Sequence, residues 1–85
     1  MLDADAFQAD VCEQMRCFVI SYNAWFDRRK LKRRYERFVA TKRAELRKLA
    51  RKATDGTTRE VLRRLESHLD AQARDAAEKM RDLFW

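Results

Sequence analysis

The chain contains no proline and a single glycine, Gly56, in 85 residues. Sheet proteins need turn residues every few positions, so this scarcity excludes most all-β and α/β folds and favours long helices. Apolar residues make up 46% of the chain, which is enough to build a core although 40% of the residues are charged. We therefore expect an all-α fold and a single helical domain covering residues 1–85, because a second core would need roughly as many residues again.

Apolar residues recur with the helical period in three stretches. They predict a first helix over about 3–26, a basic second helix over about 28–54 and a third helix over about 58–84. Helices two and three are long enough to pair antiparallel along their length. The expected architecture is a three-helix bundle, or a helical hairpin with an additional N-terminal helix.

Two boundaries follow from local signals. The apolar stripe changes direction between Asp27 and Leu31, which predicts either a tight turn capped by Asn23 or Asp27, or a kinked continuous helix. The second boundary is a hairpin turn at Thr54–Thr58. There we expect Gly56 to end the second helix and Thr57 to cap the third, in a capping box with Glu60.

Positive charge is concentrated in the second helix. Residues 28–52 hold thirteen basic and two acidic residues, whereas residues 1–27 carry a net charge of −4 and residues 53–85 a net charge of −1. A helical wheel places most of these cations opposite the apolar stripe, in two clusters separated by the small residues Ala40, Thr41 and Ala44. The face consists of Arg29, Lys30, Arg33, Arg34, Arg37, Arg47, Lys48, Arg51 and Lys52.

A line of cations about 35 Å long is suited to a phosphate backbone, because it matches the charge of a nucleic acid and releases counterions on binding. Arginine adds bidentate contacts to phosphate. No element typical of base reading is present, so the sequence predicts a small, non-enzymatic DNA- or RNA-binding protein with weak sequence specificity. The alternatives are an adaptor or inhibitor of a nucleic-acid-processing enzyme that docks on an acidic protein surface, and a merely solvated face.

The first helix carries apolar side chains on more than one side between residues 15 and 26. This distribution favours a homodimer in which the first helices of two chains pair as in a coiled coil. The alternatives are that the first helix is the central helix of a monomeric bundle, or that it binds a different protein. The expected interface consists of Phe18, Ile20, Trp25 and Phe26. At the other end of the chain, large apolar residues fray unless they dock, so Phe84 and Trp85 are expected to pack on Tyr35, Phe38 or Trp25.

Catalytic and metal-binding patterns are missing. His68 is the only histidine, and neither Ser21 nor Ser67 has a base placed beside it in the sequence. Cys12, Cys17 and His68 lack the spacing of a zinc site, so we expect no enzyme activity, metal or cofactor.

The longest uncharged stretch, residues 17–26, is too short to cross a bilayer, and the acidic N-terminus does not resemble a secretory signal. The second helix can bury its apolar stripe on the third, which argues against binding to a membrane surface. We therefore expect a cytoplasmic protein.

Overall fold

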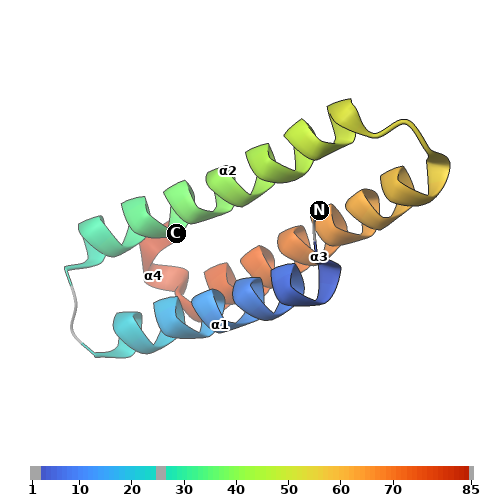
Figure 1. Ribbon diagram of the computed structural model, residues 1–85. Helices are drawn as coiled ribbons and strands as arrows, with labels where there is room; N and C mark the ends of the chain where they lie inside the picture. Colours follow the sequence, from blue (N-terminus) through green and yellow to red (C-terminus); the bar gives the residue numbers. More distant parts are fainter. Residues whose placement is uncertain (1–2, 25–26, 85) are drawn as a thin grey trace.

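A computed structural model describes residues 3–24 and 27–84 of the chain. Within these residues it contains four helices and no strand, which confirms the all-α expectation (Figure 1). The helices are α1 (Ala4–Asn23), α2 (Arg28–Lys52), α3 (Gly56–Lys79) and the short α4 (Arg81–Phe84). The three long helices form an elongated bundle of 45 × 20 × 18 Å.

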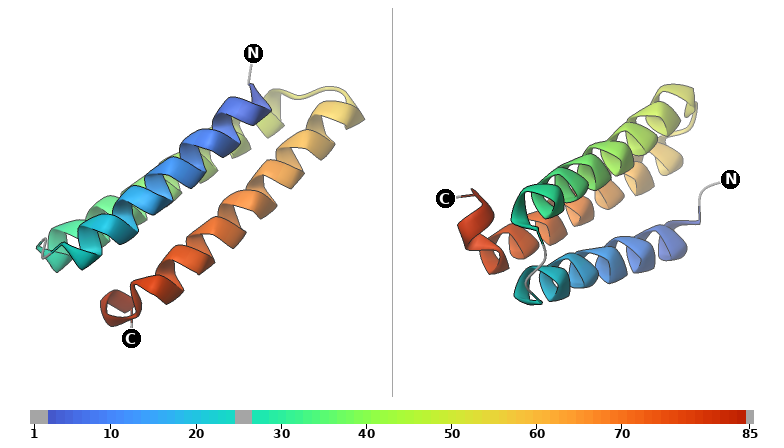
Figure 2. Two further views of the ribbon diagram at one scale, coloured as in Figure 1. Left: turned by 90° about the horizontal axis from the view of Figure 1, so that it is seen from below. Right: turned by 90° about the vertical axis from the view of Figure 1, so that its left-hand side faces the viewer.

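Helix α3 holds the bundle together. It packs along both α1 and α2, which contact each other less extensively. The three long helices run side by side in both views of Figure 2. Each helix contributes its apolar stripe to one shared core, as the helical periodicity predicts. The buried core residues are Phe7, Val11, Met15, Leu31, Tyr35, Leu46, Leu62, Leu65, Leu69, Ala76 and Met80. Val61 of α3 lies outside this core and is 38% exposed.

Each long helix begins with an aspartate whose carboxylate accepts backbone N–H groups of the first turn. Asp3 accepts from Ala6 N at 3.1 Å and caps α1. Asp27 accepts from the backbone N–H groups of residues 29 and 30 at 3.0 and 3.3 Å, and Asp55 accepts from Thr58 N at 3.2 Å. These caps satisfy donors that have no partner within the helix, and they fix where α1, α2 and α3 start.

Helix α1 has its C-cap at Ala24 and α2 has its N-cap at Asp27, so the continuous-helix alternative is wrong. Helix α1 ends at Asn23, earlier than the expected end near residue 26. Trp25 and Phe26 lie outside the described residues.

The second turn differs in detail from the prediction. Gly56 is the first residue of α3, whereas Ala53 is the C-cap of α2 with an extended backbone. Asp55 takes the capping role that was expected of Thr57, because its carboxylate reaches the Thr58 amide from one turn earlier. Helix α3 therefore starts two residues before the expected position.

The C-terminal end also departs from one continuous helix. Helix α3 stops at Lys79, the chain bends at Met80, and α4 turns back toward the junction of α1 and α2. Phe84 packs edge-on against Tyr35 with ring centroids 5.2 Å apart, which confirms the predicted docking of that residue. Asp82 accepts a hydrogen bond from the Tyr22 hydroxyl at 2.9 Å and pairs with Arg28 at 3.4 Å. Trp85 lies outside the described residues.

Candidate nucleic-acid interface

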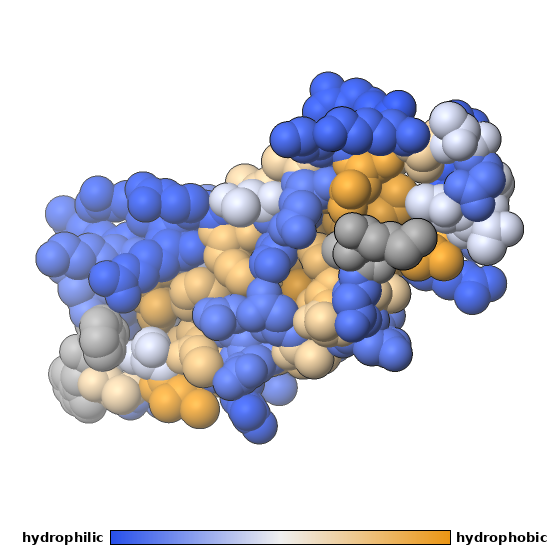
Figure 3. All heavy atoms as spheres, in the orientation of Figure 1, coloured by the Kyte–Doolittle hydropathy of each residue, from blue (hydrophilic) through white to orange (hydrophobic). Residues whose placement is uncertain are grey.

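The nine cations selected from the helical wheel are all exposed on α2. Hydrophilic side chains crowd this side of the molecule in the space-filling view, while apolar surface shows in the trough between α2 and α1 (Figure 3). Helix α2 can present these side chains outward because Leu31, Tyr35 and Leu46 bury its opposite face. The amphipathic pattern therefore orients the positive charge as the sequence predicts.

The four remaining cations of α2 are held by the bundle. Arg28 pairs with Asp82 and lies over the Tyr22 ring, and the Lys32 ammonium lies 5.6 Å from the centre of the Phe84 ring. Lys42 pairs with an α1 aspartate, Asp10, at 2.8 Å. Arg43 pairs with two α3 carboxylates, those of Asp70 at 2.6 Å and Glu66 at 3.7 Å. These four side chains stabilise contacts between helices.

The nine face residues are largely free of such partners. Among the described residues, only Arg47 of this set forms an ion pair, with Glu66 at 3.7 Å, and its side chain remains 64% exposed. Carboxylates and aromatic rings of the bundle thus engage the inner cations of α2, while most of the outer cations face solvent. Adjacent like charges on one helix repel each other, so an external anion that approaches the face lowers the electrostatic free energy of the protein.

The small residues in the middle of the face create a shallow hollow of about 720 Å³. Ala40 and Ala44 form part of its lining, and Arg43, Arg47 and Arg51 stand beside them. A backbone or phosphate group can approach the helix closely here, because short side chains leave the helix surface accessible between longer cations.

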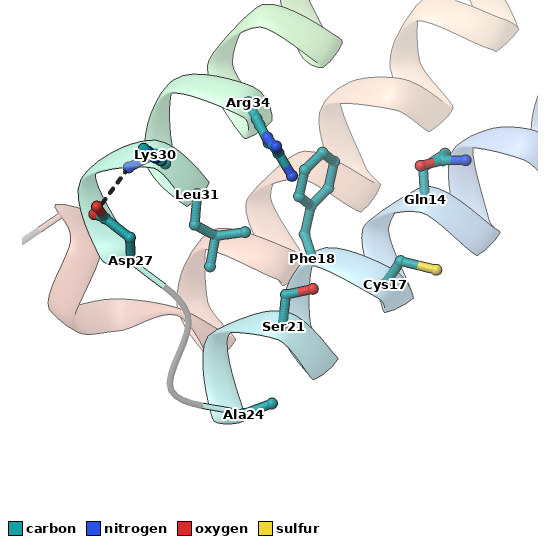
Figure 4. A pocket seen from close by; sticks show the side chains of 9 residues that line it. All are labelled: Gln14, Cys17, Phe18, Ser21, Ala24, Asp27, Lys30, Leu31 and Arg34. Carbon is teal, nitrogen blue, oxygen red and sulfur yellow. Dashed lines mark hydrogen bonds between the residues drawn. The ribbon is translucent and has the colours of Figure 1, made fainter.

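Some of the face residues border the trough between α1 and α2. At one end of it, Lys30 and Arg34 line a hollow of about 680 Å³ together with Phe18 and Cys17 of α1. Figure 4 shows Arg34 extending from α2 toward the Phe18 ring. At the other end, Lys48 and Lys52 line a second hollow of about 580 Å³. The remaining five residues of the face are all arginines, namely Arg29, Arg33, Arg37, Arg47 and Arg51.

Sequence reasoning missed two cations on the neighbouring helix. Arg59 and Arg63 of α3 line a depression at the α2–α3 seam together with Arg47 and Glu66. Arg59 donates a hydrogen bond to the Ala53 carbonyl at 3.2 Å, and Arg63 pairs with Glu60 at 3.3 Å. The net charge of −1 for residues 53–85 concealed them. Their spacing of four residues at the start of a helix was the signal that could have identified them.

The expected interface residues of the first helix fall in different environments. Phe18 is half-buried and packs on Tyr35 and Phe38, with ring centroids 5.8 and 5.7 Å apart. Ile20 points to solvent and is 59% exposed. Trp25 and Phe26 lie outside the described residues. Exposed apolar surface on α1 therefore centres on Ile20.

His68 lies closer to a cysteine than its sequence position suggested. Cys12 Sγ of α1 lies 3.6 Å from His68 Nε2 of α3, while Cys17 lines the trough toward α2. Over the described ranges, no three potential metal ligands come together. The pair therefore has no further histidine, cysteine or carboxylate to complete a metal site within the described part of one chain.

Comparisons with protein-family models, with curated proteins and with solved structures found no match. None of the helices in residues 3–24 and 27–84 has the length and apolar character needed to span a membrane.

Proposed function

We propose that the protein binds nucleic acid through the outer face of α2, with weak sequence specificity. The observation that carries this proposal is the division of the α2 cations. Arg28, Lys32, Lys42 and Arg43 are engaged within the bundle, whereas the nine outer cations have a single ion pair among the described residues. A face whose charges were needed only for stability would be expected to use them in internal pairs.

Phosphate is the favoured ligand because of its charge and its geometry. Arginine forms two parallel hydrogen bonds with phosphate oxygens, and the five cations of the face that do not line the α1–α2 trough are arginines. Arg33 and Arg37 form one cluster of the face, and Arg47 and Arg51, which line the hollow beside Ala40 and Ala44, form the other. Contacts to phosphates position a protein without reading bases, so weak sequence specificity follows.

A helix with its side chains is about 10–12 Å wide, close to the roughly 12 Å width of the major groove of B-DNA. In this arrangement α2 meets the duplex with its exposed side while α1 and α3 remain behind it. The bundle does not have to open, because the core residues of α2 face away from the nucleic acid. Arg59 and Arg63 extend the contact on the α3 side of the face.

An acidic protein partner is the second candidate function, as for an adaptor or inhibitor of a nucleic-acid-processing enzyme. The trough between α1 and α2 favours it, since Phe18 and Leu31 provide apolar lining beside the cations Lys30 and Arg34. Such a mixed lining is typical of protein interfaces, whereas phosphate contacts need only the cations.

Charge reversal distinguishes the α2 face from the rest of the surface. We expect the double variant Arg33→Glu/Arg37→Glu to lose duplex binding at least a hundredfold in a fluorescence anisotropy assay at low salt. The matched control is Arg64→Glu/Arg74→Glu, which makes the same charge change at exposed positions of α3. It should lose far less affinity. Equal losses in the two variants, or no binding by the wild type to duplex DNA, single-stranded DNA or RNA, would refute the proposal.

A further inference from the structure

The outward side of α1 carries a stripe of four exposed residues that the bundle does not use. Ala9, Glu13, Arg16 and Ile20 follow one another at intervals of four, three and four residues, so they lie along one side of the helix. Glu13 and Arg16 form no ion pair within the described residues, and Ile20 is the most exposed of the large apolar residues there.

The stripe is complementary to itself when it is reversed. Spacing of four, three and four residues reads the same in both directions, and alternating steps of three and four residues are typical of the seam along which two helices pair. If two copies of α1 lie antiparallel, Ala9 faces Ile20 of the second copy. In the same register, Glu13 faces Arg16 of the second copy, and each of these contacts occurs twice by symmetry.

We propose that two copies of this chain pair through α1 in an antiparallel arrangement. The two-fold axis crosses the helix pair at the level between Gln14 and Met15. The small Ala9 leaves room for the large Ile20, and the acid faces the base, so both steric and charge complementarity point to a second copy as the occupant. This proposal stands independently of nucleic-acid binding.

The register also agrees with where the other charges lie. The stripe faces away from the core, whose α1 residues are Phe7, Val11 and Met15, so pairing does not bring the α2 faces of the two copies together. Exposed charges separated by more than about 8–10 Å are largely screened at moderate salt. A dimer formed in this way displays two α2 faces, one on each protomer.

Reversal and exchange of the two central charges test this register. We expect the full-length wild type to dimerise reversibly in sedimentation equilibrium, with a dissociation constant below about 100 µM. Glu13→Arg and Arg16→Glu should each weaken dimerisation at least about tenfold, because like charges then face each other twice. The double variant Glu13→Arg/Arg16→Glu should restore the dissociation constant to within about threefold, and an equimolar mixture of the two single variants should form a heterodimer.

Two further variants address the apolar contact. Ile20→Lys should weaken dimerisation as well, whereas the matched control Val61→Lys changes an exposed apolar residue of α3 and should leave dimerisation unchanged. Circular dichroism confirms that each variant keeps its helices. A monomeric wild type at 200 µM, about the upper end of the tested range, overturns the proposal. A dimer that the single charge reversals leave intact, or that the double variant fails to restore, overturns it equally.

Discussion

Replacing Leu69 by alanine should destabilise the whole bundle, because this residue sits on the helix that contacts both others. Leu69 is fully buried in α3, among core residues of all three long helices. The change removes three carbon atoms, which corresponds to about 2.4 kcal/mol of transfer free energy at about 0.8 kcal/mol per methylene. A cavity that closes only in part adds about 1–2 kcal/mol, which makes a total loss of about 3.4–4.4 kcal/mol.

Such a loss is a large part of the stability that a chain of this length has, about 4–13 kcal/mol. Urea unfolding followed by circular dichroism should show the lower midpoint with an unchanged slope, and the melting temperature should fall by about 15 °C or more. Val61→Ala on the same helix is the control, and it should change the free energy of unfolding by less than about 1 kcal/mol because Val61 is 38% exposed. A loss below about 1 kcal/mol for Leu69→Ala would refute the assignment of α3 as the centre of the core.

Three further changes test individual contacts. Tyr35→Phe should lower the free energy of unfolding by about 0.5–1.5 kcal/mol in urea titrations, because its hydroxyl donates a hydrogen bond to the Ala73 carbonyl at 2.6 Å; an unchanged midpoint would contradict this contact. Asp55→Ala should melt earlier than the wild type at pH 7. Hydrogen bonds from Thr58 lower the pKa of Asp55 below 3.8. The difference in melting temperature between the variant and the wild type should therefore persist above pH 3.8 and disappear as the pH falls through the lowered pKa. A difference in melting temperature that grows in acid would count against the cap. Arg43→Ala should lose about 0.5–1 kcal/mol at low salt and less at 1 M salt, and a loss independent of salt would show that its ion pairs with Glu66 and Asp70 are not the cause.

The sequence was sufficient to predict the helical class, the three long helices and the orientation of α2, because periodicity alone determines which side of an amphipathic helix is buried. Leu31, Tyr35 and Leu46 are buried, and the nine cations opposite them are exposed, as the helical wheel predicts. At the first boundary, local chemistry left a cap at Asn23, a cap at Asp27 and a kinked helix as alternatives, and the structure has the cap at Asp27.

Other features depend on how the helices are rotated against one another. At the second turn, Asp55 and Thr57 are both good caps, and the sequence offers no means of ranking them without the geometry of the turn. The bend at Met80 has no glycine or proline to mark it. The proximity of Cys12 and His68, and the pairing of Arg43 with Asp70, result from the packing of helices far apart in the sequence. Local patterns contain no information on these contacts.

The salt dependence of nucleic-acid affinity tests the central proposal most directly. Fluorescence anisotropy with a labelled duplex, repeated between about 20 and 200 mM salt, gives the number of phosphates that the protein neutralises. If four to six cations of the α2 face contact phosphates, the logarithm of the affinity should fall against the logarithm of the salt concentration with a slope of roughly −4 to −5. A slope near zero, or no detectable binding at the lowest salt concentration, would contradict the assignment of this face to nucleic acid.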